Sequence, residues 1–333
     1  MRFNQVVFRL SMVALLLTSA IVFVVAQDDL DRGQWCEGVN IRFFAGGSEG
    51  DAFAGIVYRG ALAAARDLGP NVEYVFSGWD SETMVQQLRE AVAQQPDGIA
   101  MMGHPGNDAL LPLAAEAAEA GVIMMYQNVD VPVVRSTYGG GYVGAQLYSQ
   151  GRALGDEAVR QFGLQSGDTA LVLINLTQME RSQREQGVID AFTDIGMTVV
   201  NIDSPPTWAA DPNLGIPSMT SALAANPEAK IVAFSGGQVL GNARTYFEAA
   251  GLSAGQVKAI GFDTNEFIIQ GLAEDWIHLT SDQQPFLQGY MPILSICQTA
   301  KFGLAPLNVD TGAGFIDANN YESVADLAVR GYR

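Results

Sequence analysis

The sequence predicts an α/β fold with two similar doubly wound parallel-sheet lobes, joined by three hinge crossings, and a cleft between the lobes. Short apolar runs alternate with helical patterns of ten to fifteen residues, which is typical of a parallel sheet covered by helices. This alternation stops at a glycine-rich stretch, residues 136–145, and then begins again. With 333 residues, the chain is long enough for two domains of ordinary size.

The first lobe is predicted to consist of successive strand, turn and helix units. A glycine turn and an alanine-rich helix follow the first strand, and Ser81 is expected to cap the second helix. The glycine-rich stretch lacks a clear period and is interpreted as a linker to the second lobe. Strands are expected at residues 41–46, 72–77, 98–103 and 122–127.

The second lobe repeats this pattern without evident repetition of sequence. A long helix follows Pro285, and the tail at 307–321 is expected to be extended. Crossings between lobes are placed near residues 144, 284 and 312. They assign residues 38–143 and 285–311 to the first lobe, and residues 144–284 and 312–333 to the second. Strands of the second lobe are expected at residues 170–175, 198–202, 231–236, 257–263 and 277–283.

The first 26 residues have the pattern of an export signal. Two arginines precede an apolar run from Leu10 to Val25, and cleavage is expected near Ala26, which predicts a periplasmic protein. A retained membrane anchor is the alternative, although the run is short for a membrane span. Cleavage would leave 16 basic against 36 acidic residues, a net charge of −20. Nucleic acid is therefore not an expected partner, because its binding depends on cationic side chains that neutralise phosphates.

The two cysteines, Cys36 and Cys297, are the only ones in the chain. Export allows a disulfide between them, but the sequence does not show that they meet. His104 and His278 lie far apart, and no Cys/His cluster has the spacing of metal ligands. Neither a metal nor another cofactor is expected.

The turn after the first strand, Gly46 to Asp51, is expected to form one wall of the cleft. In an open α/β sheet the ligand crevice lies beyond the carboxyl ends of the strands. The turn does not have the G-x-G-x-x-G spacing, and its carboxylates, Glu49 and Asp51, would repel a pyrophosphate. A carboxylate accepts hydrogen bonds well from the hydroxyls of a neutral polyol. The alternative is that both acids only favour the helix N-terminus through its dipole.

Four short motifs occur in order along the chain. GDAF follows the first strand, R-x-x-G opens the helix at Arg184, GFD ends a late strand at Asp263, and Gln283 comes 20 residues later. With their order and spacing, the chain from about residue 38 to 325 resembles the ribose-binding type of periplasmic binding protein. These proteins are the solute receptors of ABC sugar importers. The resemblance implies that two lobes close over one sugar.

The resemblance also implies roles for individual residues. Asp51 and Gln283 match hydrogen-bonding positions, and Phe53 matches an aromatic residue that covers an apolar sugar face. Arg184 matches an arginine that reaches ring and hydroxyl oxygens, and Asp263 matches an acceptor that closes the site.

Three positions depart from the family pattern. Asn128 stands where an aspartate is usual, Ala54 where a second aromatic residue is common, and Gly236 where asparagine is usual. These changes favour a six-membered ring or an inositol over ribose.

Other side chains at strand ends or in loops are predicted to complete the pocket. His104, Asn128, Trp208 and Gln238 are placed in the ligand-binding set. Trp208 would act as a lid over the cleft, and its alternative role is a packing anchor. His104 alternatively braces its turn, and Trp79 is either a cleft residue or a core residue.

The predicted function is a non-catalytic receptor that gives a monosaccharide or cyclic polyol to a membrane ABC permease, and a monomer is expected. A binding protein that feeds a chemoreceptor or signalling system is the alternative. A glycoside-processing enzyme is more remote, although Glu49 and Asp263 could pair as acid and base. The chain lacks the dinucleotide fingerprint and the G-x-S-x-G motif.

Overall fold

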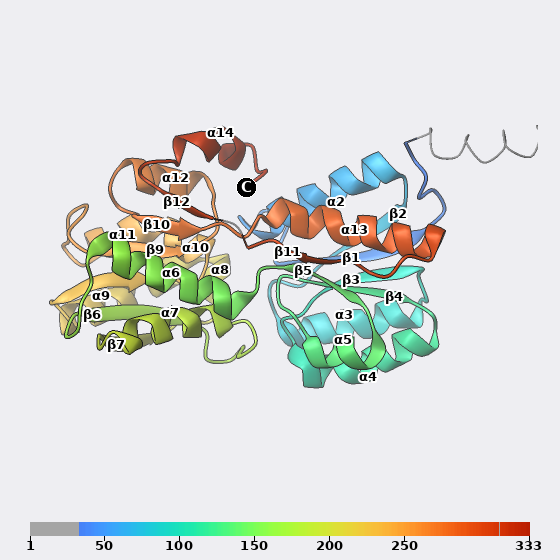
Figure 1. The fold of residues 1–333 in the computed structure, drawn as a ribbon, viewed down its shortest axis with the longest axis horizontal. Helices are drawn as coiled ribbons and strands as arrows, with labels where there is room; N and C mark the ends of the chain where they lie inside the picture. The colour runs from blue at the N-terminus through green and yellow to red at the C-terminus, as the bar shows by residue number, and fades with distance from the viewer. Residues whose placement is uncertain (1–32, 313) are drawn as a thin grey trace, which may run out of the picture.

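The computed structural model describes residues 33–312 and 314–333, which form two α/β lobes (Figure 1). Each lobe is built on a six-stranded sheet with helices on both faces. Within those residues, no helix is long and apolar enough to span a bilayer. The predicted export signal, residues 1–26, lies outside the described residues.

The N-terminal lobe has the strand order β11-β5-β4-β3-β1-β2, and every neighbouring pair in this sheet is parallel. Helices α2 and α13 lie on one face of the sheet, and α3, α4 and α5 lie on the other (Figure 1). The bounds are β1 Asn40–Gly46, α2 Ala54–Leu68, β2 Asn71–Phe76, α3 Ser81–Ala93, β3 Gly98–Met102, α4 Gly106–Glu119, β4 Ile123–Gln127, α5 Pro132–Tyr138, β5 Gly141–Gly144, α13 Pro285–Phe302 and β11 Asn308–Asp310.

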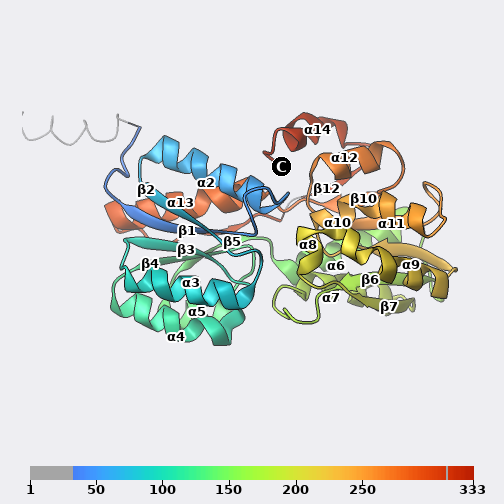
Figure 2. The ribbon, with the colours of Figure 1, turned by 180° about the vertical axis from the view of Figure 1, so that it is seen from behind.

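The C-terminal lobe has the corresponding order β12-β10-β9-β8-β6-β7, but its β12 is antiparallel to β10. Helices α6 and α7 cover one face of the sheet in Figure 1. Helices α8 to α11 are visible in Figure 2, which shows the molecule from the opposite side. The bounds are α6 Leu147–Phe162, β6 Thr169–Ile174, α7 Gln183–Asp194, β7 Thr198–Asp203, α8 Thr207–Ala210, the 3₁₀ helix η1 Pro212–Gly215, α9 Ile216–Ala225, β8 Ala229–Ala233, α10 Gly237–Gly241, α11 Ala243–Ala249, β9 Lys258–Phe262, α12 Glu266–Ala273, β10 Leu279–Ser281, β12 Phe315–Asp317 and α14 Glu322–Val329.

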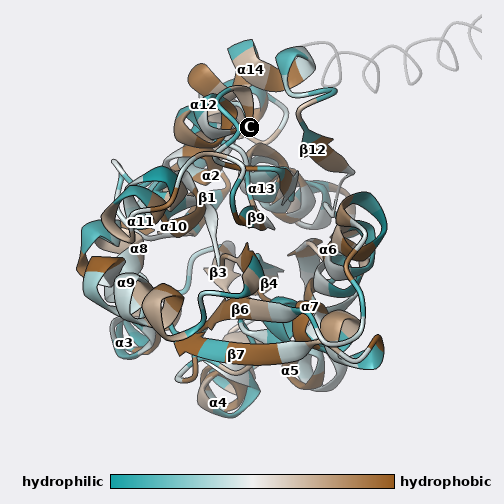
Figure 3. Ribbon diagram, turned by 90° about the vertical axis from the view of Figure 1, so that its left-hand side faces the viewer, coloured by the Kyte–Doolittle hydropathy of each residue, from teal (hydrophilic) through white to brown (hydrophobic). Residues whose placement is uncertain are grey.

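The hydrophobic core follows from strands that are buried on both faces. The strand β6, TALVLI, is buried at all six positions, as a central strand of a parallel sheet requires. In the C-terminal lobe, alternate residues of β6 belong to separate apolar clusters on the two sides of the sheet: Leu171 and Leu173 in one, Ala170 and Val172 in the other. In Figure 3 hydrophobic colour gathers on strands such as β4, while the outward side of α11 is hydrophilic.

In each lobe, a glycine allows two helices to approach closely. A Cβ at Gly60 would collide with the carbonyl of Phe286, where α2 meets α13. In the C-terminal lobe, a Cβ at Gly151 of α6 would collide with the backbone carbonyl of Arg184 in α7. The second contact fixes the helix turn that carries Arg184.

Three segments connect the lobes, as expected from the sequence: residues 145–146, residues 282–284, and the stretch to which residues 311–312 and 314 belong. The interpretation of residues 136–145 as a linker is wrong for most of that stretch. It contains the end of α5 and the strand β5, which pairs with β4 and β11. All four residues of β5 are buried, and a side chain at Gly141 would collide with the carbonyl of Leu307, so its glycines reflect tight packing.

The structure joins Cys36 and Cys297 in a disulfide, with Cα atoms 5.5 Å apart. Both cysteines belong to the hydrophobic core of the N-terminal lobe. The bridge ties the segment before β1 to helix α13, so that lobe is cross-linked to itself.

Candidate functional site

The candidate site is a cavity of about 90 Å³ between the two lobes. Parallel strands of both sheets end at this cleft, where the backbone turns into the following helix. Four lining residues come from the N-terminal lobe, Gln283 comes from a crossing, and the rest come from the C-terminal lobe. The lining consists of Phe53, Trp79, His104, Asn128, Asn175, Gln178, Arg181, Arg184, Ser204, Pro205, Pro206, Ala209, Ser235, Gly236, Gln238, Val239, Asp263 and Gln283.

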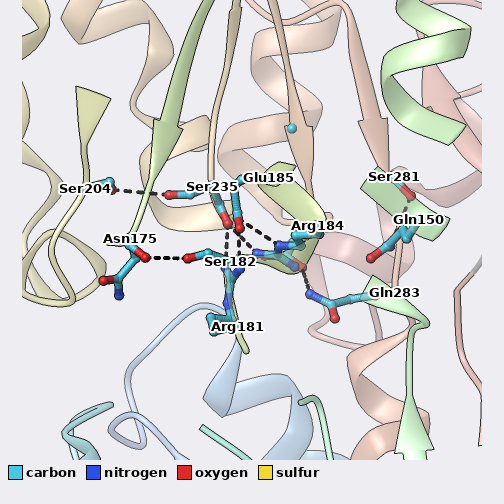
Figure 4. Close-up of polar contacts among 12 residues, drawn as sticks. Gln150, Asn175, Arg181, Ser182, Arg184, Glu185, Ser204, Ser235, Ser281 and Gln283 are labelled. Atoms are coloured by element: carbon cyan, nitrogen blue, oxygen red, sulfur yellow. Dashed lines mark hydrogen bonds and ion pairs between the residues drawn. The ribbon is translucent and has the colours of Figure 1, made fainter. Parts of the chain in front are cut away.

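Two arginines from the C-terminal lobe approach one backbone carbonyl. Arg181 and Arg184 both donate to the carbonyl oxygen of Ser235 and both pair with the carboxylate of Glu185 (Figure 4). The Arg184 side chain is 2% exposed, and its guanidinium lies 4.3 Å from the centroid of the Phe262 ring. Burial lowers the pKa of Arg184 to about 10, so the guanidinium remains charged at neutral pH. The site therefore presents fixed cationic donors.

A chain of hydrogen bonds joins the N-terminal lobe, a crossing and the C-terminal lobe. Asn128 donates through Nδ2 to Oε1 of Gln283 at 3.2 Å, and Gln283 donates through Nε2 to Oδ1 of Asp263. Asp263 in turn accepts the backbone N–H of Gly237 at 2.7 Å. Asn128 and Asp263 have φ values of 64° and 75°, a region that non-glycine residues seldom adopt. The sequence placed these three side chains at one site, and the structure brings them together.

In the structure Asp51 makes its hydrogen bonds to the protein itself, whereas the resemblance implies direct contact with a sugar. Its Oδ1 accepts the backbone N–H groups of Phe53 and Ala54, both at 2.8 Å. Its Oδ2 accepts the indole N–H of Trp79 at 2.8 Å, and the side-chain amide of Gln238 donates to Oδ1 at 2.9 Å. Burial raises the pKa of Asp51. With four internal donors, Asp51 is absent from the cavity lining; it holds the start of α2, the aromatic wall and the opposite lobe together.

The wall from the N-terminal lobe is aromatic. The ring of Trp79 lies 6.0 Å from that of Phe53 and 5.1 Å from that of His104, centroid to centroid. His104 is 5% exposed, and its Nδ1 has no hydrogen-bond partner among the described residues. Burial, followed by the charges of Arg181 and Arg184, lowers the pKa of His104 to about 3. The imidazole is therefore neutral at physiological pH, with a nitrogen that no described residue satisfies.

Trp208 does not line the cleft, so its placement in the ligand-binding set is wrong. It is 6% exposed and belongs to the hydrophobic core of the C-terminal lobe. A Cβ at Gly215 would lie 2.9 Å from its ring, which shows how tightly the indole is enclosed. The other interpretation of Trp208, as a packing anchor, is the one that the structure supports. Its neighbours Pro206 and Ala209 line the cavity instead.

Sequence reasoning missed several polar residues of the C-terminal lobe. Asn175 directly follows β6, Ser204 directly follows β7, and Ser235 comes two residues after β8. Strand ends would have identified them by the same rule that identified Asp263. Gln178 and Arg181 had no such signal, because they lie in the loop before α7. Gln178 also crosses the cleft, donating to the carbonyl of Trp79 at 3.3 Å.

Among residues 33–312 and 314–333, no group of three or more His, Cys, Asp or Glu side chains is placed to hold a metal ion. Glu49, which the sequence suggested as a partner for Asp263 in acid and base chemistry, is exposed in the turn before α2 and does not line the cavity. The cavity therefore combines an aromatic wall from the N-terminal lobe with hydrogen-bonding groups that come mostly from the C-terminal lobe.

Two α/β lobes with corresponding strand orders, joined by three crossings around one polar cleft, define a hinged ligand-binding protein. The chain belongs to the family described as periplasmic binding protein domain, whose model matches residues 43–303. A solved structure with the same fold is a carbohydrate transporter from Acidothermus cellulolyticus in complex with myo-inositol. It is 25% identical, with a TM-score of 0.76, and the match covers 89% of this chain and 99% of that one.

Two curated relatives are matched over a smaller share of their own length. The xylose/arabinose-binding protein of Sulfolobus acidocaldarius is 26% identical over 256 residues, which cover 73% of this chain but only 62% of that protein. The D-ribose/D-allose-binding protein of Pseudomonas aeruginosa is 24% identical over 232 residues, covering 67% of this chain and 70% of that protein.

Proposed function

We propose that this protein binds a monosaccharide or cyclic polyol between its two lobes and delivers it to a membrane ABC permease. The single observation that carries the proposal is the pairing of an aromatic wall with a wall of fixed donors and acceptors around one cavity. A sugar ring has apolar C–H faces and a rim of hydroxyls, so it needs both kinds of surface. Two proteins that resemble this chain are named for xylose, arabinose, ribose and allose, and a third is solved in complex with myo-inositol, which supports this class of ligand.

In this proposal Phe53 covers an apolar face of the ring, and Trp79 extends the same wall. Arg184, Asp263, Asn128 and Gln283 bind hydroxyl groups. The hydrogen bonds among these residues leave further donor and acceptor positions on the guanidinium and carboxylate, and each hydroxyl both donates and accepts. His104 contributes one neutral nitrogen. Asp51 and Gln238 act across the cleft, stabilising the closed arrangement of the lobes. The role is binding without catalysis.

The same proposal includes export to the periplasm with cleavage near Ala26, and action as a monomer. The disulfide between Cys36 and Cys297 supports export, because such bonds persist in oxidising compartments. Mass spectrometry of the secreted protein would test the cleavage, and sedimentation analysis would test the monomer.

A thermal-shift panel of pentoses, hexoses and inositols tests the proposed ligand class, with amino acids and inorganic anions as the comparison set. A ligand at 100 times its dissociation constant adds about 2.7 kcal/mol to the stability of the folded state. At least one neutral polyol should therefore raise the melting temperature. The proposal fails if only amino acids or anions raise it.

A further inference from the structure

Gly236 occupies a position on the cavity wall where the backbone does not require glycine. It lies between β8 and α10 with φ −177° and ψ 172°, an extended conformation that any residue adopts. A Cβ at this position would lie 3.4 Å from Nη2 of Arg184, 3.7 Å from Nη2 of Arg181 and 3.8 Å from Oε1 of Gln238. These are ordinary van der Waals distances, so a methyl group would fit without shifting its neighbours. What glycine provides here is space.

That space is bordered by both donors and an acceptor. Each guanidinium has five N–H groups, and the contacts of Arg181 and Arg184 within the described residues go to Glu185 and to the Ser235 carbonyl. Further N–H groups of both arginines therefore remain for a ligand. Gln238 uses its Nε2 to bind Asp51, which leaves its Oε1 as an acceptor beside Gly236.

The groups around Gly236 favour some ligand substituents over others. A carboxylate only accepts hydrogen bonds and would face Oε1 of Gln238 unfavourably, whereas a hydroxyl accepts from a guanidinium and donates to an amide oxygen. The charges agree with a neutral group, because Glu185 pairs with both arginines and the carboxylate of Asp263 interacts with Arg184. A hydroxymethyl group would place its carbon where the Cβ would lie, and its hydroxyl would reach the donors and the acceptor around that point.

We infer that Gly236 determines ligand specificity: its empty side-chain position receives the exocyclic hydroxymethyl group of a hexopyranose, whose hydroxyl binds Arg181, Arg184 and Gln238. This inference rests on the proposed function and narrows its ligand class. It makes pentopyranoses, which lack that substituent, the weaker ligands.

Two pairs of sugars test the inference because their members differ only in this group. D-glucose without its hydroxymethyl is D-xylose, and D-galactose without it is L-arabinose. Isothermal titration calorimetry of the wild-type protein should show a hexose binding at least about tenfold tighter than its matched pentose in one pair. The substitution Gly236→Ala should raise the dissociation constant of that hexose by about tenfold or more. The dissociation constant of the matched pentose should change by no more than about twofold.

The retained pentose affinity shows that the Gly236→Ala variant is folded, and Ser253→Ala is the control. Ser253 is exposed on the same lobe and does not line the cavity, so this variant should bind both sugars like the wild type. The inference is overturned if Gly236→Ala weakens both members of a pair equally, or if each pentose binds as tightly as its hexose. If no sugar or inositol binds at all, the proposed function itself fails.

Discussion

The two lobes share a strand order but contribute different chemistry to the cleft. The N-terminal lobe supplies rings, Phe53, Trp79 and His104, whereas the C-terminal lobe supplies buried charges, chiefly Arg184 and Asp263. Asp51, the carboxylate just before α2 in the N-terminal lobe, is bound by four internal donors. One architecture therefore provides shape on one side and hydrogen-bonding specificity on the other.

The largest effect that we predict is a loss of stability when the disulfide of the N-terminal lobe is removed. Replacing either cysteine of the Cys36–Cys297 pair by serine should reduce the free energy of unfolding by about 2–4 kcal/mol, because the unfolded chain is no longer constrained. Urea unfolding of the oxidised protein measures this loss. The double variant should lose no more than either single variant, and additive losses would mean that each cysteine contributes only by packing.

The next largest effect is a loss of ligand binding when a buried charge of the C-terminal lobe is removed. Arg184→Ala should weaken ligand binding by about 1.5–3 kcal/mol, since it removes a charged donor at a buried site. Calorimetry with the ligand found in the thermal-shift panel measures the loss. Arg244→Ala is the control, because that arginine makes exposed ion pairs on the same lobe with Glu248 and Glu274. Equal affinities of the two variants would remove Arg184 from the site.

Each lobe also holds one buried histidine. Variants of the two histidines should affect stability alike but ligand binding differently. Burial lowers the pKa of His104 to about 3 and that of His278 to about 4, from an ordinary 6.5. Between these values and 6.5 the unfolded chain binds more protons, so each histidine reduces stability as the pH falls, by at most about 1.4 kcal/mol per pH unit.

Urea unfolding at pH 7 and pH 5 should show that His104→Asn and His278→Asn each remove part of this pH dependence. Ligand affinity should change only in the His104 variant, because His104 lines the cavity and His278 does not. A wild-type pH dependence in both variants would contradict the assignment.

The smallest effect concerns the aromatic wall. Trp79→Phe keeps a ring but removes the N–H group that donates to Oδ2 of Asp51, so we expect a loss of about 1 kcal/mol in stability and a weaker effect on binding. Thermal unfolding with and without ligand measures both. Trp35→Phe is the matched control, because Trp35 packs on Phe302 of the same lobe, with ring centroids 5.2 Å apart. A larger loss of binding than of stability would mean that a phenylalanine ring does not replace the indole in the aromatic wall.

Much of the fold could be predicted from the sequence because strand and helix periods are local properties. The strand β5 could not be predicted, because its glycine-rich sequence shows no alternation of apolar and polar residues. Its glycines are explained only by contacts with residues distant in sequence, such as Leu307. The site divides in the same way. Asp263 and Gln283 follow strands, and the structure places both at the cleft, whereas the burial of Trp208 depends on how the helices of its lobe pack.

The disulfide also decides what a protease can release. Cys36 and Cys297 are separated by 261 positions, and the whole span from β1 to β10, with most of α13, lies between them. A single cut in any loop of that span would leave both fragments attached through the bridge. The nicked protein would keep its mass until a reductant is added, so proteolysis of the cleft loops would be visible only on a reducing gel.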